Sequence, residues 1–283
     1  MITPAEIADI RWQDPQRVRA AVRERRRPEP YAGKLLVIAC DHPARGALAA
    51  GANPTAMADR WDLLQRLAVA LSRPGVRGFL GTADLVEDLA LMGALDDLLV
   101  FGSMNRSGLA GAAYEMDDRL TGYTAAGIEE SGLDGGKMLL RIDPADPGSN
   151  LTLERCGQAV TDLARRDLVA MVEPFLSARV DGTSRNDLSA DAVVRSIAIA
   201  SGLGTDASRT WLKIPAADDM ARVARATTLP LLVLGGEVSP ANHDRWAEAM
   251  AQPAVRGLVI GRSLLYPADD DVAGAVDRVA ALT

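Results

Sequence analysis

The sequence predicts an α/β protein whose architecture is a (β/α)8 TIM barrel with an extra N-terminal helix. The chain of 283 residues contains eight short runs of leucine and β-branched residues. These runs are continuous rather than alternating, as strands buried on both faces of a parallel sheet require. Amphipathic segments separate most of them, which is typical of parallel α/β folds. A doubly wound open sheet is the alternative fold.

The predicted strands follow one another along the chain at residues 34–40, 76–82, 97–102, 137–142, 168–175, 210–214, 229–234 and 257–260. Helical periodicity is present at residues 57–71, 153–166, 190–201, 218–226 and 240–250, and a last helix is predicted at 272–282. No linker rich in proline, glycine or serine divides these elements. We therefore expect residues 1–283 to form one barrel domain, with residues 1–33 as a helical extension.

Two segments do not fit the repeating unit. Residues 1–27 are predicted as an extra helix, and the basic cluster at residues 23–27 as a solvated face or an oligomer contact. Residues 103–136 form a long, glycine-bearing segment after the third strand. Long loops in compact domains are often functional, and this one would lie at the carboxyl ends of the strands, where barrel active sites are found.

The bulk composition excludes several classes of function. A net charge of −7 and a pI of about 5.0 argue against a nucleic-acid partner, which needs a basic surface. No apolar run approaches about 18 residues, so no membrane span is expected, and residues 1–27 lack the apolar core of a signal peptide. We expect a cytoplasmic enzyme that acts on a small molecule, with homo-oligomer formation left open.

Cysteine and histidine are scarce in this chain. Cys40 and Cys156 form no CxxC motif, and we expect both to be reduced thiols in the core. His42 and His243 are accompanied by no HExxH motif and no cysteine pair, so a zinc site is disfavoured. We expect no metal and no cofactor, although a magnesium ion held by carboxylates stays open.

Lysine is rare in this chain. Of its 31 lysine and arginine side chains, three are lysines, namely Lys34, Lys137 and Lys213. A desolvated lysine amine, unlike a guanidinium, can lose its proton near neutral pH and attack a carbonyl to form a Schiff base. Lys213 lies in the apolar sixth strand, which stops at Pro215, whereas Lys34 precedes the first strand and is expected to be a surface charge. An arginine-rich composition is the competing explanation of the scarcity.

Several residues could act together with Lys213. Period-two alternation places Trp211 and Lys213 on one face of their strand, and an inward-facing Lys213 could lie near Lys137 of the fourth strand. Asp41, at the end of the first strand, and Glu173, on the fifth, supply carboxylates for proton transfer. The competing interpretations are an Asx turn or a helix cap for Asp41 and an ion pair with a lysine for Glu173.

Glycines at the ends of the last two strands predict a phosphate site. Gly235 and Gly236 follow the seventh strand, before residues 237–239, and Gly261 and Arg262 follow the eighth. Such glycines let backbone N–H groups approach an anion, and Arg262 would add a guanidinium beside a helix N-terminus. The loops after strands seven and eight commonly bind phosphate in barrels, although a Gly-Gly pair alone is more often a tight turn.

Three arginines lie where a second anion could bind. Arg45 follows the first strand, Arg106 lies in the long segment, and Arg141 lies on the fourth strand. A guanidinium matches the planar geometry of a carboxylate or phosphate. A second anion site among these arginines would decide which sugar phosphate is the substrate.

Together these residues resemble the class I (Schiff-base) aldolases of the tagatose-1,6-bisphosphate aldolase branch, which are related to deoxyribose-phosphate aldolase and archaeal-type fructose-bisphosphate aldolase. The resemblance spans residues 34–265. The run Asp-His-Pro-Ala-Arg-Gly-Ala-Leu from Asp41 is similar to that branch's Asp-Gln-Arg-Gly-Ala-Leu, with two extra residues. Lys-Met-Leu-Leu from Lys137 is similar to its Lys-Leu-Leu run, and Glu173 and the Leu-Lys-Ile-Pro around Lys213 match its fifth and sixth strands.

The resemblance implies that Lys213 is the nucleophile and that dihydroxyacetone phosphate is released. Lys137, Glu173 and Asp41 would orient the substrate and move protons. Arg141 and Asp143 stand where relatives often have tyrosines, which leaves the proton shuttle unassigned. Deoxyribose-phosphate aldolase uses a lysine on strand seven where this chain has Gly-Gly-Glu, so that activity is not expected.

Two other functions are compatible with the same residues. A metal-independent sugar-phosphate isomerase or epimerase would keep the phosphate site and use Asp41 and Glu173 as an acid–base pair. A phosphosugar-binding protein would use the site without turnover. The substrate stays open among fructose or tagatose bisphosphate, a deoxy-keto-gluconate phosphate and a sulfo-sugar phosphate.

Overall fold

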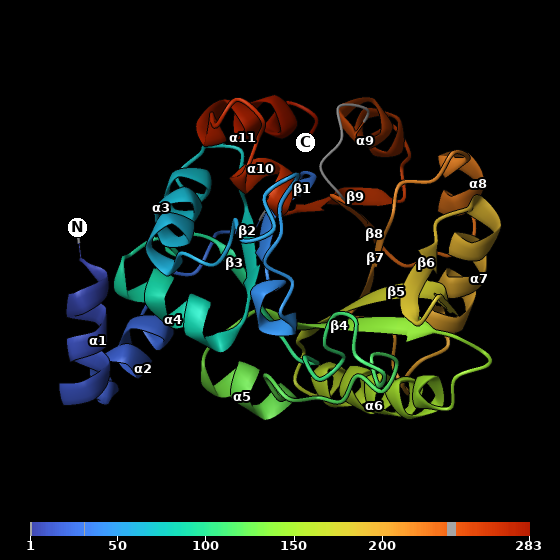
Figure 1. The fold of residues 1–283 in the computed structure, drawn as a ribbon, viewed down its shortest axis with the longest axis horizontal. Coiled ribbons are helices and arrows are strands. Elements are labelled where there is room, and N and C mark those ends of the chain that lie inside the picture. The colour runs from blue at the N-terminus through green and yellow to red at the C-terminus, as the bar shows by residue number, and fades with distance from the viewer. Residues whose placement is uncertain (1, 31, 237–241) are drawn as a thin grey trace.

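Eight parallel strands close into a barrel with helices around its outside (Figure 1). The computed structural model describes residues 2–30, 32–236 and 242–283. The barrel strands are β1 Leu35–Cys40, β2 Gly78–Gly81, β3 Leu99–Ser103, β4 Gly135–Ile142, β5 Val169–Val180, β7 Thr210–Ile214, β8 Leu231–Leu234 and β9 Val255–Ile260. Parallel pairing of β1 with β9 and of β4 with β5 completes the ring. The predicted barrel is therefore confirmed, and the open-sheet alternative is wrong.

The helices lie outside the ring of strands. They are α1 Pro4–Gln13, α2 Pro15–Arg23, α3 Arg60–Leu71, α4 Ala83–Leu91, α5 Ala125–Glu130, α6 Gly148–Ala164, α7 Ala190–Ser201, α8 Met220–Ala224, α9 Asn242–Met250, α10 Arg262–Leu265 and α11 Val272–Ala280, with a 3-10 turn, η1, at Pro43–Arg45. None of the described helices is long and apolar enough to cross a membrane. Residues 237–239 after the seventh predicted strand, and the first two residues of the predicted helix 240–250, lie outside the described residues.

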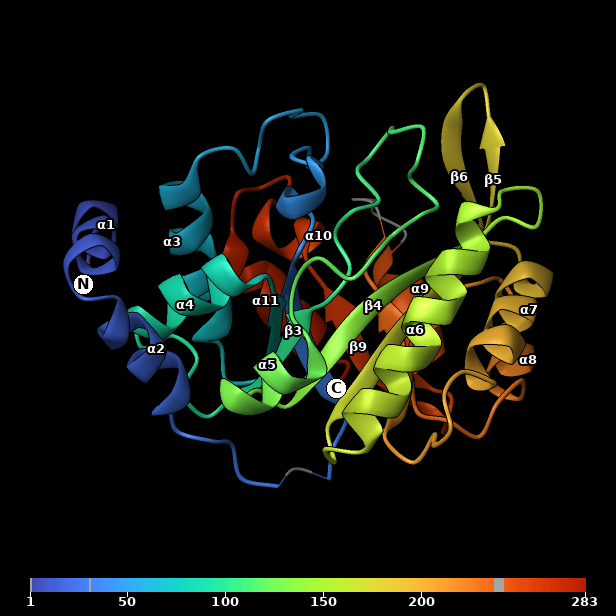
Figure 2. The same ribbon diagram turned by 90° about the horizontal axis from the view of Figure 1, so that it is seen from below.

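The N-terminal extension is two helices rather than the single helix that we expected. Asp14 ends α1 and caps α2, because its carboxylate accepts from the backbone N–H of Arg17 and Pro15 takes the first helical position. Arg11 joins α1 to α4 through Glu87 and Asp88, at 2.5 and 2.8 Å. Figure 2 shows α1 and α2 beside α4.

The basic cluster at residues 23–27 is only partly solvated. Arg25 is buried, and its guanidinium lies 3.0 Å from the carboxylate of Asp134. Arg26 is exposed and pairs with Asp97 at 2.7 Å. The prediction of a solvated face is therefore wrong for Arg25, which attaches the extension to the turn before β4.

An apolar layer fills the barrel below the carboxyl ends of its strands. Its buried members are Leu35, Val37, Ala39, Leu80, Phe101, Val169, Met171, Leu232 and Val259, with Leu99 and Trp211 packed against them. The rings of Phe101 and Trp211 lie 5.8 Å apart. Trp211 faces the barrel interior as the period-two pattern predicted, so Lys213, two residues on, lies on the same face. Cys40 and Cys156 are buried and unpaired, as expected.

A β-hairpin extends the barrel at its carboxyl end, where we had expected β5 to stop at residue 175. The second strand, β6 Thr183–Asp187, pairs antiparallel with the end of β5, and Val180 lies opposite Thr183. Asp181 and Gly182 form the two-residue turn with φ of 51° and 75°, which is the geometry that an Asp-Gly hairpin favours. Figure 2 shows the hairpin rising beside the long segment between β3 and α5.

Candidate active site

A cavity of about 830 Å³ opens at the carboxyl ends of the barrel strands. Its lining includes residues from β1, β4, β5, β7 and β9 and from the segments that follow the strands. Eight lysines and arginines line it, against two carboxylates, although the chain carries a net charge of −7. The described lining is therefore cationic within an acidic protein, which suits an anionic ligand. Among the described residues, no three His, Cys, Asp or Glu side chains are grouped to hold a metal ion.

Two buried lysines share one carboxylate in this cavity. The Nζ of Lys213 lies 2.8 Å from Oε1 of Glu173, and the Nζ of Lys137 contacts Oε2 of the same side chain. Lys137 also lies 3.1 Å from Oδ2 of Asp41, which lies 2.9 Å from a guanidinium nitrogen of Arg106. Each of these charges is at most 8% exposed. Positive and negative side chains alternate along this chain of contacts. The attraction between neighbours offsets the free-energy cost of removing the five charges from water.

The strand order explains why these side chains meet. β5 lies between β4 and β7, so Glu173 lies between the strands of the two lysines. Lys137 pairs with Met171, one layer below Glu173, and its long side chain reaches upward to the carboxylate. Lys137 therefore faces the same cavity as Lys213 despite lying near the start of its strand. The ion pair that competed with a catalytic role for Glu173 is present with both lysines.

The two carboxylates are ionised at neutral pH. Burial raises the pKa of Asp41, but Arg106 and Lys137 outweigh it and hold that pKa well below its usual value. Burial also opposes ionisation of Glu173, yet Lys137 and Lys213 lower its pKa to about 2. The pKa of Lys137 is itself lowered, because its burial outweighs the attraction of the two carboxylates. Asp41 and Glu173 are therefore negative charges that hold the amines in place.

His42 is a functional candidate that we had considered only as a metal ligand. It follows Asp41 and precedes η1, its side chain is 32% exposed, and it lines the cavity. Its Nδ1 lies 3.8 Å from Oδ1 of Asp41. Burial lowers the pKa of His42 to about 4, against the attraction of Asp41. The imidazole is therefore neutral at neutral pH, so one ring nitrogen carries a basic lone pair.

The predicted phosphate residues line the same cavity. Gly235 and Gly236 follow β8, and Gly261 and Arg262 follow β9. Gly236 has a φ of 66°, which favours glycine, and a Cβ at Gly261 would collide with the carbonyl oxygen of Ala39. Close packing against Ala39 therefore explains a glycine at position 261 without any ligand. Arg262 forms no ion pair with any residue that the structure describes, and its Nε is buried without a hydrogen-bond partner.

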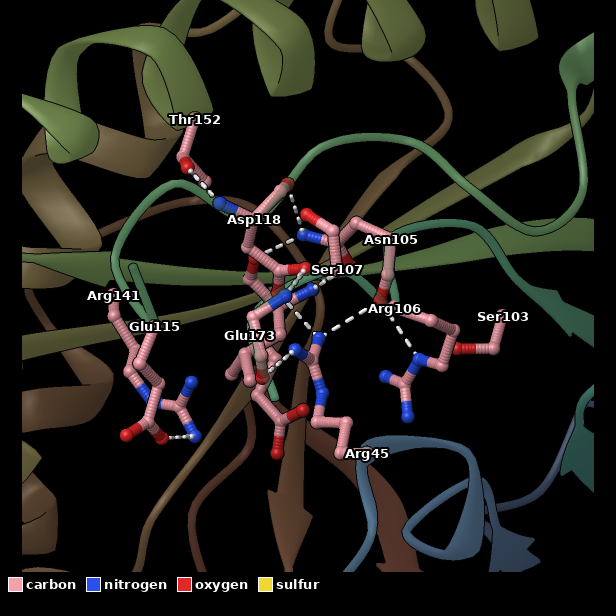
Figure 3. Close-up of polar contacts among 12 residues, drawn as sticks. Arg45, Ser103, Asn105, Arg106, Ser107, Glu115, Asp118, Arg141, Thr152 and Glu173 are labelled. Carbon is pink, nitrogen blue, oxygen red and sulfur yellow. Dashed lines mark hydrogen bonds and ion pairs between the residues drawn. The ribbon is translucent and has the colours of Figure 1, made fainter. Parts of the chain in front are cut away.

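The three arginines expected at a second anion site all have protein partners (Figure 3). Arg45 pairs with Asp118, and Arg141 pairs with Glu115 at 2.9 Å, while Arg106 pairs with Asp41 as described above. Asp118 and Glu115 belong to the long segment after β3. These pairs fasten that segment over the cavity. Arg141 keeps one buried guanidinium nitrogen, Nη1, without a hydrogen-bond partner.

The hairpin adds cavity residues that the sequence analysis missed. Ser184, Arg185 and Asn186 of β6 line the cavity. The Asp-Gly pair at residues 181–182 between two short runs was the sequence signal that could have identified the hairpin. Arg185 is exposed, lines the cavity and forms no ion pair with the residues that the structure describes.

The barrel has the fold of solved Schiff-base-forming fructose-1,6-bisphosphate aldolases. A Schiff-base-forming fructose-1,6-bisphosphate aldolase superposes with a TM-score of 0.65 at 17% identity, over 94% of this chain and 99% of that one. An archaeal fructose-1,6-bisphosphate aldolase gives 0.65 at 18% identity, over 88% and 94%. At these identities the likeness is one of fold.

The chain belongs to the Cgl0159-like family, whose model matches residues 33–280. The crystal structure of Cgl0159 from Corynebacterium glutamicum is 51% identical, with a TM-score of 0.97, and the match covers 100% of this chain and 98% of that one. No curated protein matches the chain.

Proposed function

We propose that this protein is a class I aldolase, in which Lys213 forms a Schiff base with the carbonyl of a phosphorylated ketose or keto-acid. The observation that carries the proposal is the position of Lys213. Its amine is buried at the carboxyl end of a barrel strand, faces a large cavity and lies 2.8 Å from Glu173. A solvated surface lysine has none of these properties.

The neighbouring groups suit the proton transfers of Schiff-base formation. Lys213 gives a proton to Glu173, its neutral amine adds to the carbonyl carbon, and that proton then goes to the carbinolamine hydroxyl, which leaves as water to give an iminium. Glu173 contacts the attacking nitrogen and can carry protons between that nitrogen and the departing oxygen. Lys137 holds Glu173 and Asp41 in position. The iminium then accepts the electron pair of the carbon–carbon bond that breaks.

The cationic lining supports a phosphorylated substrate. Gly235, Gly236, Gly261 and Arg262 are the proposed ligands of the phosphate, and the guanidinium of Arg262, which forms no ion pair with the described residues, supplies the charge. Binding of the phosphate beside Lys213 would leave dihydroxyacetone phosphate on the enzyme after cleavage. The likeness in fold to a Schiff-base-forming fructose-1,6-bisphosphate aldolase supports this reaction class. The tagatose-bisphosphate branch remains a prediction from the sequence motifs.

Borohydride trapping tests the proposal directly. Incubation of the protein with dihydroxyacetone phosphate and sodium borohydride should reduce the imine and add a stable mass to the peptide that contains Lys213. The variant Lys213→Arg should take no label. Lys34→Arg is the matched control, because Lys34 lies before β1 and contacts the backbone carbonyls of Met250 and Gln252.

A screen of phosphorylated ketoses for release of triose phosphate would then identify the substrate. The proposal fails if the wild-type protein takes no label and Lys213→Ala still turns over a sugar phosphate. That result would favour the isomerase or epimerase alternative, with Asp41 and Glu173 as its acid–base pair.

A further inference from the structure

Cleavage of a carbon–carbon bond needs a proton acceptor near the hydroxyl of the departing carbon, and the two carboxylates of the site are already engaged by cations. Asp41 contacts Lys137 and Arg106 through one oxygen and accepts a hydrogen bond from Ser103 at 3.1 Å. Glu173 uses one oxygen for each lysine. Among the described residues that line the cavity there is no tyrosine and no cysteine. The imidazole of His42 lines the same cavity and is a further candidate.

The position of His42 fits that role. It follows β1 directly, so its backbone is held beside the charged centre, and its side chain lines the cavity. Its Nδ1 is buried without a hydrogen-bond partner and lies 3.8 Å from Oδ1 of Asp41. A proton on Nδ1 is the tautomer that the neighbouring carboxylate favours, and Nε2 then carries the free lone pair.

We propose that His42 is a catalytic residue that moves the proton during carbon–carbon bond cleavage, an inference that rests on the proposed function. An imidazole nitrogen accepts the proton of the hydroxyl on the departing carbon as the carbon–carbon bond breaks. The electron pair of that bond moves to the iminium on Lys213 and forms an enamine, and the aldehyde leaves. The imidazolium then returns its proton to the enamine carbon, which restores the iminium for hydrolysis.

The charges around His42 favour this cycle once a substrate binds. The charged groups that act on the imidazole are Asp41, Arg262, Lys213 and Glu173. The two cations lower its proton affinity, and Asp41 and Glu173 raise it. A phosphate bound at Arg262 would cancel one of the opposing cations. Substrate binding therefore makes His42 a stronger base at the step that needs one.

Deuterium exchange into dihydroxyacetone phosphate isolates the proposed step. In D2O, the iminium on Lys213 loses a proton from the hydroxymethyl carbon and regains a deuteron, and NMR measures the rate. We expect the variants His42→Asn and His42→Gln to take the borohydride label at Lys213 but to exchange roughly 100-fold or more slowly than wild type. The variant His243→Asn should behave as wild type, because His243 lies on α9 and does not line the cavity.

Rescue by a small base separates chemistry from structure. Added imidazole should restore exchange in His42→Ala, whereas a merely structural role would not respond to it. Exchange at the wild-type rate in labelled His42→Asn would overturn the inference. Loss of the label in all three His42 variants would also overturn it, because His42 would then act on the fold or on imine formation. A wild-type protein that takes no label would reject the proposed function itself.

Discussion

Lys213 and Lys137 approach the same carboxylate from strands on opposite sides of β5, and each contacts a different oxygen of Glu173. Both amines contact Glu173, although Lys137 also contacts Asp41, so a change at Glu173 affects both amines at once. When Lys213 becomes an iminium, its positive charge stays on the same nitrogen, and Glu173 remains its counter-ion. The pair thus provides one nitrogen for the covalent bond and a second ammonium that holds the carboxylate.

Replacement of Glu173 by Gln should impair Schiff-base formation more than folding. The variant loses the charge that pairs with Lys213 and Lys137 and the group proposed to carry protons at the carbinolamine. We expect the rate of borohydride labelling to fall by roughly 100-fold or more. The control is Asp134→Asn, which removes the negative charge that pairs with the buried Arg25 away from the cavity. Equal labelling rates in the two variants would contradict a role for Glu173 in this step.

Arg262 should contribute to phosphate affinity and little to stability. It forms no ion pair with the described residues, so Arg262→Ala breaks none of the described pairs. Loss of one charge-assisted hydrogen bond of about 1.5–3 kcal/mol should weaken binding of dihydroxyacetone phosphate roughly 10- to 100-fold. Titration calorimetry measures this, with Arg256→Ala as control, since Arg256 is the exposed residue of β9 on the same chain segment. An unchanged affinity would remove Arg262 from the phosphate site.

Arg185 of the hairpin should distinguish ligands with one anionic group from ligands with two. Arg45, Arg106 and Arg141 pair with protein carboxylates, whereas Arg185 forms no ion pair with the described residues. We expect Arg185→Ala to weaken binding of fructose 1,6-bisphosphate about tenfold and to leave dihydroxyacetone phosphate unaffected. Arg195→Ala, an exposed change on α7, serves as control. Equal losses for both ligands would indicate that Arg185 attracts anions without contacting a second group.

The barrel could be predicted because its signal is local. Each barrel strand is buried on both faces and therefore appears in the sequence as a continuous apolar run. The two lysines stood out for the same reason, since an ionisable residue is unusual in such a run. The break at Asp14 and Pro15 and the Asp181-Gly182 hairpin also carried local signals, a cap with a proline and a turn dipeptide. Both features are therefore predictable from the sequence.

The arrangement of the site was harder to predict because it depends on contacts between distant residues. Nothing in the sequence near Arg45 indicates that Asp118 is its partner, and the same holds for Arg141 and Glu115. The order and register of β4, β5 and β7 bring Glu173 into contact with both lysines, and neither can be read from the local sequence. Arg45 and Arg141 were therefore predicted to contact a ligand, whereas in the structure they form ion pairs with the segment after β3.

Asn105 makes a contact of this kind with the backbone of Leu139, and its removal should lower the free energy of unfolding. Its side chain is fully buried, donates to the carbonyl of Leu139 at 2.6 Å and accepts from the N–H of Leu139 at 2.8 Å. Asn105→Ala leaves both backbone groups unpaired and should cost about 2–4 kcal/mol of unfolding free energy. Chemical denaturation measures this. Ser107→Ala, in the same segment but only part-buried, should cost about 1 kcal/mol. Equal costs would mean that the segment is held mainly by its ion pairs.

His42 should make the stability of the fold depend on pH between about 6.5 and 4. Burial lowers the pKa of His42 from 6.5 to about 4 in the folded protein, so over this range the unfolded chain binds a proton that the folded chain does not. Its stabilising effect is present above pH 6.5 and is lost as the pH falls toward 4. The melting temperature of the wild type should therefore fall more steeply across this range than that of His42→Asn. The control variant His243→Asn should show the same dependence of melting temperature on pH as the wild type. If the wild-type curve is instead parallel to that of His42→Asn, the imidazole of His42 is protonated as readily in the folded protein as in the unfolded chain.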